Sequence, residues 1–219
     1  MSFPPPYRLV SLRESGDAFE YACANASSLG AGALVWTRRF DLAEFAVVLE
    51  PAESLLTARQ VFPVGMDALI EALAAVAPPQ MPISLDWPDT IRVDGVLVGG
   101  GRLGWPEGVA ENEEPDWLVF GSMLRTALLH SVDSGLRPRN GALEELGFTQ
   151  LDVGTLLESF TRHLLAAFYA LAQGGFEAIQ QQHRMYKTDG EPGSLDLDQL
   201  REKLVISAWL DRSTGLPWL

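Results

Sequence analysis

Apolar side chains recur along the chain with two periods, and these periods predict an alternation of helices and strands. From Asp17 to Leu29 they follow helical spacing, and Asp17 is placed to cap the first turn. Residues Val64 to Val76 are apolar on nearly every face, which predicts a buried helix ending at Pro78-Pro79. Asp152 to Ala172 is the best amphipathic segment, and we expect a third helix there that ends at Gly174-Gly175.

Short apolar runs without a helical period predict strands. Ala33 to Trp36 and Phe45 to Leu49 fit two buried strands, and Trp117 to Phe120 fits another. Asp94-Gly95 lies between two β-rich runs and predicts a hairpin, because a type I′ turn needs positive φ at both central residues. The pattern therefore predicts an α+β fold with a mixed, largely antiparallel sheet flanked by helices.

The segment around Lys187 to Gly193 is the one candidate linker. It is polar and contains Gly190 and Gly193. We therefore expect one domain over residues 1–186 and a C-terminal tail over residues 187–219 that packs on it through apolar triplets such as Ala208-Trp209-Leu210. Shorter helices are predicted at 176–186 and 196–204.

Composition and charge narrow the classes of partner. Of the 219 residues, 47% are hydrophobic, so the chain can build a core. The net charge of −13 disfavours sequence-independent binding to nucleic acid or to an anionic membrane surface. No apolar run reaches the about 18 residues of a membrane span, and the N-terminus lacks the pattern of a secretory signal. We expect a cytoplasmic protein.

Few residues suggest chemistry by themselves. The three histidines show no metal spacing, and Cys23 is best explained as a buried, unreactive thiol. The carboxylates of the loop from Pro106 to Pro115 could hold Mg²⁺, but such runs usually form a solvated surface, so no metal site is predicted. Gly99-Gly100-Gly101 could let a ligand approach the backbone, or it could mark a bulge or tight sheet packing.

One longer constellation resembles a known family. Leu85-Asp86-Trp87-Pro88-Asp89, a hairpin and then Val98-Gly99-Gly100 are similar to biotin–protein ligases, which carry Lys-Trp-Pro-Asn-Asp, a short hairpin and a Lys shortly before an Ala-Gly pair. The order of predicted elements agrees from about Asp17 to Tyr186. The chain looks closest to the divergent branch described as biotin/lipoate A/B protein ligase-like.

This resemblance implies a class II synthetase-like catalytic domain that activates a small carboxylic acid with ATP and Mg²⁺. The acid would be biotin, lipoate or a similar molecule, and it would pass to a lysine of a biotinyl or lipoyl carrier protein. Carried over by position, the expected substrate-binding residues are Trp87, Pro88, Asp89, Gly99, Gly100 and Gly121.

The chain differs from the family in lacking its positively charged side chains. Leu97 occupies the position of the family's catalytic lysine, and Asp86 that of the lysine before Trp-Pro. The arginine-rich glycine loop that folds over the adenylate is missing, since only residues 37–44 join the two strands there. Arginines could supply a relocated clamp for phosphate or carboxylate, or they could be surface residues with snorkelling stems. The candidates are Arg38, Arg39, Arg92, Arg102 and Arg125.

Two hypotheses follow. The first is a ligase that adenylates a small acid and transfers it to a carrier lysine. The second is a catalytically inactive small-acid-binding or regulatory protein that has lost adenylation. Fold analogy favours the ligase and residue chemistry favours the binder, because losing a preorganised donor costs about 3–4 kcal/mol of transition-state stabilisation.

Overall fold

A seven-stranded mixed sheet forms the centre of the molecule. The computed structural model describes residues 1–14, 16–129, 139–149, 151–183, 185–186, 200, 204 and 207–218. The strand order is β1-β2-β3-β7-β6-β5-β4; β1 and β2 are parallel and the other neighbours antiparallel. The bounds are β1 Arg8–Leu12, β2 Ala33–Thr37, β3 Leu42–Leu49, β4 Ile83–Asp86, β5 Thr90–Val93, β6 Val96–Gly104 and β7 Leu118–Arg125.

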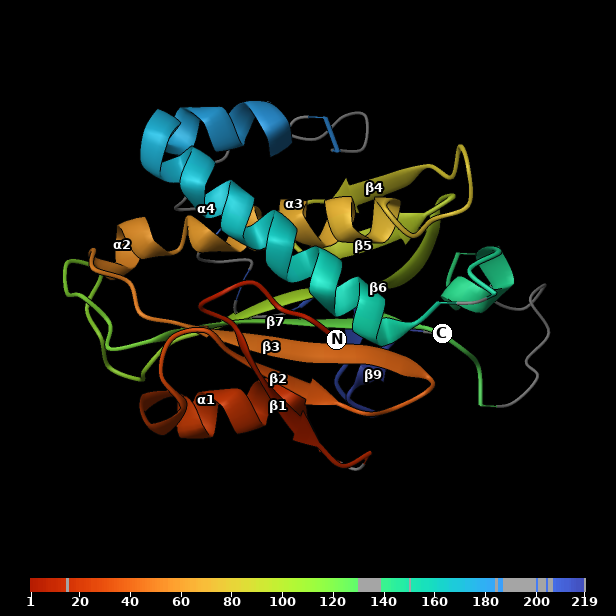
Figure 1. Cartoon of the computed structure of the whole chain (residues 1–219), viewed down its shortest axis with the longest axis horizontal. Helices are drawn as coiled ribbons and strands as arrows, with labels where there is room; N and C mark the ends of the chain where they lie inside the picture. The colour runs from red at the N-terminus through yellow and green to blue at the C-terminus, as the bar shows by residue number, and fades with distance from the viewer. Residues whose placement is uncertain are drawn as a thin grey trace.

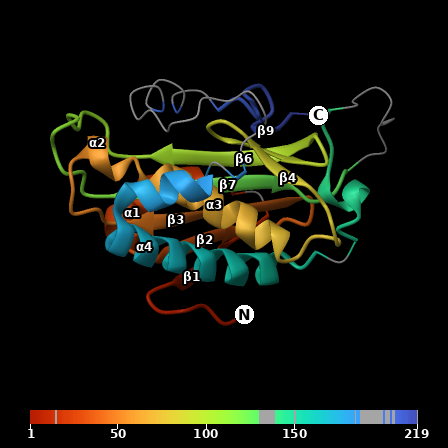
Figure 2. The same cartoon turned by 90° about the horizontal axis from the view of Figure 1, so that it is seen from above.

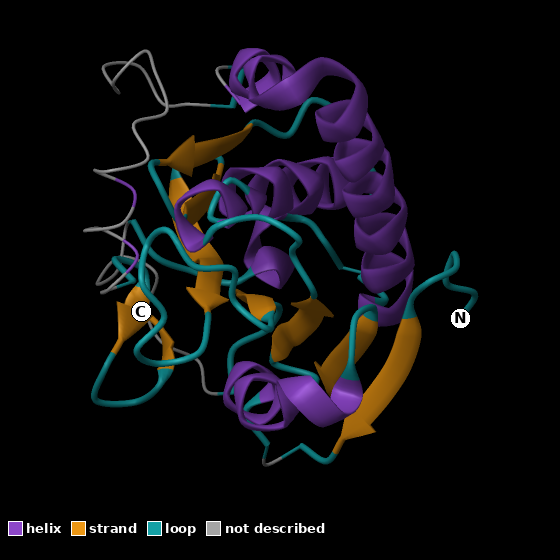
Figure 3. Cartoon of the chain, turned by 90° about the vertical axis from the view of Figure 1, so that its left-hand side faces the viewer, coloured by secondary structure: helices purple, strands orange, loops and turns teal. Residues whose placement is uncertain are grey.

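Helices lie on both faces of this sheet. Figure 1 shows α3 (Val61–Ala74) and α4 (Val153–His183) on one face and α1 (Ala18–Leu29) on the other, and Figure 3 shows the same layers from the side. A short helix, α2 (Leu55–Ala58), precedes α3, and a 3-10 turn, η2 (Leu143–Leu146), precedes α4. The observed architecture is thus the α+β arrangement that the hydrophobic pattern predicts.

The larger core lies between the sheet and the α3–α4 layer. It includes the ring cluster Phe45, Phe120 and Phe160, whose neighbouring centroids are 4.8 and 5.8 Å apart. A smaller cluster lies under α1, where the small side chains of Ala18, Ala22 and Ala26 let that helix sit close to the strands. Near the C-terminus, β8 (Leu210–Asp211) and β9 (Leu216–Pro217) form a two-stranded hairpin that packs on the α1 face of the sheet. Figure 2 shows β9 close to the C-terminus.

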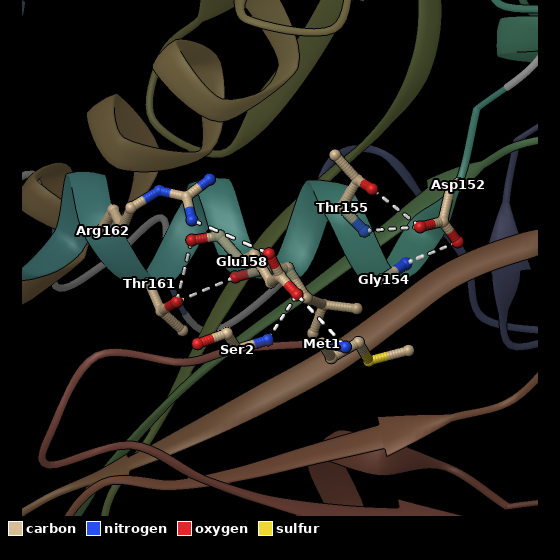
Figure 4. A network of polar contacts seen from close by, with 9 residues as sticks. Met1, Ser2, Asp152, Gly154, Thr155, Glu158, Thr161 and Arg162 are labelled. Carbon is tan, nitrogen blue, oxygen red and sulfur yellow. Dashed lines mark hydrogen bonds and ion pairs between the residues drawn. The ribbon is translucent and has the colours of Figure 1, made fainter.

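The start of α4 is fixed by polar contacts, which Figure 4 shows. Asp152 accepts hydrogen bonds from the backbone N–H groups of Gly154 and Thr155 at 3.2 and 3.0 Å and so caps the helix. The Thr155 hydroxyl also donates to Asp152, at 2.7 Å. This bond first, and then the two backbone bonds, hold the pKa of Asp152 below its usual range. Glu158 accepts from the Ser2 N–H at 2.5 Å, and this contact ties the N-terminal arm to the helix.

Several predicted elements are confirmed. Asp17 caps α1 by accepting from the Glu20 N–H at 2.9 Å, and the helix ends at Gly30. Asp94 and Gly95 have φ of 49° and 77°, as the predicted hairpin turn requires. The helix predicted at 64–76 is α3, shifted to 61–74, and it is almost wholly buried.

Other elements differ from the prediction. β1 is not among the predicted strands, because its five residues are exposed or half-buried and contain no long apolar run. Gly175, with a non-helical φ of 65°, divides α4 into two helical segments at a kink, which agrees with the predicted helix end at Gly174-Gly175. The predicted helix at 176–186 is the second segment, and it ends at His183. The predicted helix at 196–204 lies largely outside the described residues. Within the described part of the chain, no helix combines the length and hydropathy needed to cross a membrane.

Candidate functional site

The glycines of β6 pack tightly against their neighbours. Gly99 has φ of 148°, at a register irregularity between β5 and β6, and a Cβ there would lie 2.9 Å from the Leu124 Cα and overlap the Met123 carbonyl. A Cβ on Gly101 would run into the Met66 sulfur on the α3 face. The run of glycines therefore serves close packing at these two positions.

Gly100 lies under the C-terminal segment. A Cβ at this position would lie 2.5 Å from Nε1 of Trp209 and would also overlap the Asp89 carbonyl. The Trp209 side chain is fully buried, and its indole N–H donates to the Gly101 carbonyl at 3.0 Å. The backbone surface that a ligand could reach at Gly100 is thus covered by an indole ring of the same chain.

Two further hydrogen bonds hold this C-terminal segment on the sheet. Asp89, 2% exposed, accepts from the Ala208 N–H at 3.0 Å through one carboxylate oxygen and from the Thr90 hydroxyl at 3.0 Å through the other. Arg125 donates from Nη2 to the Pro217 carbonyl at 2.6 Å. The turn between β8 and β9 is closed by Asp211, which accepts from the Ser213 N–H at 2.9 Å.

Leu97, the residue at the family's lysine position, belongs to the same packing. It is 6% exposed and forms a cluster with Leu42, Met123 and Trp209 on the α1 face of the sheet. Its backbone is also fixed, since its N–H donates to the Arg139 carbonyl at 2.7 Å. Leu97 thus presents an apolar contact to the tail, at the position where the sequence resemblance leads us to expect a lysine.

The remaining residues predicted for substrate binding are not all beside Gly100. Trp87 packs in the core on the α3 side, and its peptide bond to the buried Pro88 is cis. Gly121 lies under α1, where a Cβ would overlap the Phe19 ring. Of the predicted set, the structure brings Asp89, Gly99 and Gly100 together under or beside the C-terminal segment.

The five candidate arginines divide into two groups. Arg39, Arg102 and Arg125 lie near carboxylates on the α1 face. The charges of Arg39 and Arg125 lower the pKa of Asp41. The charges of Arg102 and Arg39 lower that of Glu44, although burial outweighs them. Arg38 stacks on Trp36 with 5.8 Å between its guanidinium carbon and the ring centroid, and Arg92 pairs with Asp86 at the β4–β5 edge.

The carboxylates among these arginines are buried. Burial raises the pKa of Glu44, partly offset by the hydrogen bond that it accepts from the Ala18 N–H at 2.7 Å. Burial opposes ionisation of Asp41 as well, but the bidentate pair with Arg39, at 3.0 and 2.6 Å, outweighs it and leaves the pKa of Asp41 lowered. The arginines on the α1 face therefore already have acidic neighbours within the chain.

Sequence reasoning did not assign Trp209, Ala208 or Pro217 to the glycine site. The apolar triplet 208–210 indicated that the tail packs on the domain, but no local signal says where. The bond from Trp209 to Gly101 spans 108 residues, so its partner can be known only from the fold.

Two other candidates for chemistry are engaged in structure. In the acidic loop, Glu111 forms an ion pair with the buried Arg59 at 2.5 Å, and among the described residues no three His, Cys, Asp or Glu side chains are grouped as a metal site would need. Cys23 is half-buried on α1, facing Gly104 of β6. Burial, followed by the charge of Glu20, raises the pKa of its thiol to about 12, so little reactive thiolate forms near neutral pH.

Comparison with known proteins decides the family. The model of the biotin/lipoate A/B protein ligase family matches residues 3–185. This chain belongs to that family. No curated protein matches the sequence significantly.

Solved structures agree with this biotin/lipoate ligase-like fold. A biotin protein ligase-like protein of unknown function from Silicibacter sp. TM1040 is 30% identical, with a TM-score of 0.76 over 85% of this chain and 80% of that one. The apo biotin protein ligase from Aquifex aeolicus is 17% identical, with a TM-score of 0.66 over 83% of this chain and 78% of that one. The biotin protein ligase from Leishmania major, in complex with biotin, is 14% identical, with a TM-score of 0.59 over 86% and 84% of the two chains. The last two show the fold alone.

Proposed function

We propose that this family member binds a small carboxylic acid without adenylating it, and that residues 207–218 cover its binding site. The observation that carries the proposal is Leu97 buried beneath Trp209 at the position of the family's lysine. An adenylating enzyme needs a cation or a preorganised donor at the reacting phosphate, and Leu97 provides neither.

Three of the five candidate arginines already hold carboxylates and so do not compensate for this loss. Arg39 is paired with Asp41, Arg92 with Asp86, and Arg102 with Asp17 at 3.4 Å while it stacks on Phe19. Binding ATP there would require breaking these pairs and leaving unpaired carboxylates, the buried Asp41 among them, beside a polyphosphate. The residues present therefore do not fit ATP and Mg²⁺, and a carrier protein has no activated acid to receive.

The contacts of Trp209 indicate what kind of acid could bind in its place. Its flat bicyclic ring covers Gly100, and its N–H satisfies the Gly101 carbonyl. A ligand that displaces the indole must supply another donor, because a buried carbonyl left unpaired costs free energy. The ureido ring of biotin has N–H groups and the dithiolane ring of lipoate has none, so we expect biotin or a biotin-like acid to compete better.

A partner for the acid's carboxylate lies on the same face. Arg125 follows Met123 by two residues along β7, which places it roughly 7 Å further along the strand. Displacing the tail would release its Nη2 from the Pro217 carbonyl. A carboxylate could then take the place of that carbonyl as a charge-assisted acceptor.

Pyrophosphate exchange and ligand binding test the two parts of this proposal. We expect no exchange with biotin, lipoate or octanoate in the presence of ATP and Mg²⁺; robust exchange with any of them would establish the ligase hypothesis instead. We expect calorimetry to show that Trp209→Ala binds biotin at least tenfold more tightly than the wild type, because the competing indole is gone.

Two further variants make the binding result interpretable. Trp218→Ala changes an exposed tryptophan of the same segment and should leave biotin affinity unchanged. Ala208→Pro removes the N–H that Asp89 accepts while keeping Trp209, and it should also raise biotin affinity. Equal affinity in the wild type, Trp209→Ala and Ala208→Pro would show that the tail does not cover an acid site.

A further inference from the structure

A partly open cavity lies at the other end of β7. It has a volume of about 380 Å³ and is lined where β3 ends and β7 begins, at the paired residues Leu49 and Leu118. Leu118 precedes Met123 by five residues, so the cavity is roughly 17 Å along the strand from the contacts of Trp209. It is therefore separate from the candidate acid site.

The walls of this cavity are largely apolar and come from four parts of the chain. Leu165, Phe168 and Leu171 of α4 form one wall, and Ala58 and Val61 at the α2–α3 junction form another. Pro6 and Tyr7 of the N-terminal arm close a third side, and the Glu158 contacts of Met1 and Ser2 hold the start of that arm on α4 (Figure 4). The cavity is thus built by fixed elements.

The charged groups of the lining are all negative. Glu50 and Glu53 are exposed residues of the segment that follows β3, and the lining contains no Lys, Arg or His. Glu50 accepts from the Ala31 N–H at 3.2 Å, and no hydrogen bond of the Glu53 side chain occurs among the described residues. Carboxylates beside apolar surface attract a cation and repel an anion.

Uncharged polar groups add hydrogen-bonding capacity. Tyr7 and Gln60 both line the cavity, and neither side chain has a hydrogen-bond partner among the described residues. Burial raises the pKa of the Tyr7 hydroxyl to about 12, so this group stays protonated and can donate or accept. A ligand with a polar group could pair with either side chain.

We propose that this cavity is a second binding site, whose ligand is a small hydrophobic amine, protonated at neutral pH. Its apolar body would contact Leu165, Phe168 and Val61, and its ammonium group would lie toward Glu50 and Glu53. The volume corresponds to about a dozen water-sized units, which suits a molecule of about ten heavy atoms. The site selects against carboxylic acids, in contrast to the site proposed under the C-terminal segment.

Three probes of equal chain length test this assignment by calorimetry: octylamine, octanol and octanoate. We expect octylamine to bind at least tenfold more tightly than octanol at neutral pH and low salt, and octanoate to bind least. Higher salt should narrow the difference between amine and alcohol. Absence of octylamine binding, or octanoate binding equal to it at the same site, would overturn the proposal.

A variant of the lining tests whether octylamine binds in this cavity. Ala58→Leu adds volume at a lining position and should weaken octylamine at least tenfold; only binding that this variant removes belongs to the cavity. A melting temperature of the free variant close to that of the wild type shows that it is folded. Undiminished octylamine binding in folded Ala58→Leu would place the amine elsewhere and refute the proposal.

A matched pair of double variants completes the test. Glu50→Gln with Glu53→Gln should reduce the preference for amine over alcohol at least fivefold while leaving octanol affinity unchanged. Glu107→Gln with Glu114→Gln makes the same change in net charge at exposed residues outside the lining and should leave the preference intact. Equal losses in both double variants would show that only the overall charge of the protein attracts the amine.

Discussion

The two ends of β7 differ in how the chain uses them. At the Met123 end, Trp209 fills the space over Gly100, and Leu97, Leu42 and Met123 close around the indole. At the Leu118 end, the side chains of α4 and of the α2–α3 junction leave a cavity of about 380 Å³. The end where the sequence resemblance predicts substrate binding is filled by the protein's own Trp209, while the end for which it predicts no site has a cavity.

This difference shows that a motif locates a surface but does not determine what occupies it. Glycines at 99 and 100 permit close approach to the backbone, and such an approach serves a ligand and a tryptophan side chain equally well. The tail supplies both the ring and the hydrogen-bond donor that a ligand would bring. Under the proposed function, binding of the acid therefore depends on the free-energy difference between the docked and the released tail.

The largest effect is expected where the closed end is broken. Trp209→Ala removes a fully buried aromatic side chain and should lower the free energy of unfolding by about 3–5 kcal/mol. Chemical denaturation followed by circular dichroism measures this change. Trp218→Ala, with 43% of that residue exposed, should cost no more than about 0.5 kcal/mol. A loss below about 1 kcal/mol for Trp209→Ala would mean that the tail contributes little to the fold.

A smaller effect is expected at the glycine that the indole covers. Gly100→Ala forces a Cβ toward Nε1 of Trp209 and the Asp89 carbonyl, and such overpacking costs about 1–3 kcal/mol. The cost should fall by at least about 0.5 kcal/mol when the same change is made in Trp209→Ala, because one of the two clashes is gone. Denaturation of the two single variants and the double variant gives this interaction energy. Strict additivity would contradict direct contact between Trp209 and Gly100.

Local signals in the sequence predict the strands around Gly100 but not the C-terminal segment that covers them. The Asp94-Gly95 turn and the Trp87-Pro88 segment define the β4–β6 region, because a type I′ turn and a hydrophobic alternation are local properties. The cover over Gly100 is not local, since Ala208 and Trp209 bond to Asp89 and Gly101 across more than a hundred residues. The sequence therefore predicts the exposed backbone but not its occupant.

The candidate arginines likewise show that the sequence gives the charged residues but not their partners. A list of Arg38, Arg39, Arg92, Arg102 and Arg125 is available from the sequence, but their partners are not. Arg102, for example, pairs with Asp17 only because the fold brings β6 beside the start of α1. The cavity at Leu118 has no local signal at all, because it is bounded by side chains from the N-terminal arm, the α2–α3 junction and α4.

The smallest predicted effect concerns the helix that walls the open end. Asp152→Ala removes the cap of α4 and should cost about 1 kcal/mol at pH 7, measured by chemical denaturation. The pKa of Asp152 is lowered in the folded protein, so its stabilisation is present above the unfolded pKa of about 3.9 and is lost as the pH falls through the folded value. The difference between wild type and Asp152→Ala should accordingly shrink below about pH 4. Asp116→Ala, at an exposed carboxylate, should change stability by less than about 0.5 kcal/mol at either pH. A cost for Asp152→Ala that stays constant from pH 7 to pH 3 would show that the ionised carboxylate does not cap α4, and would remove the fixed helix start on which the cavity wall depends.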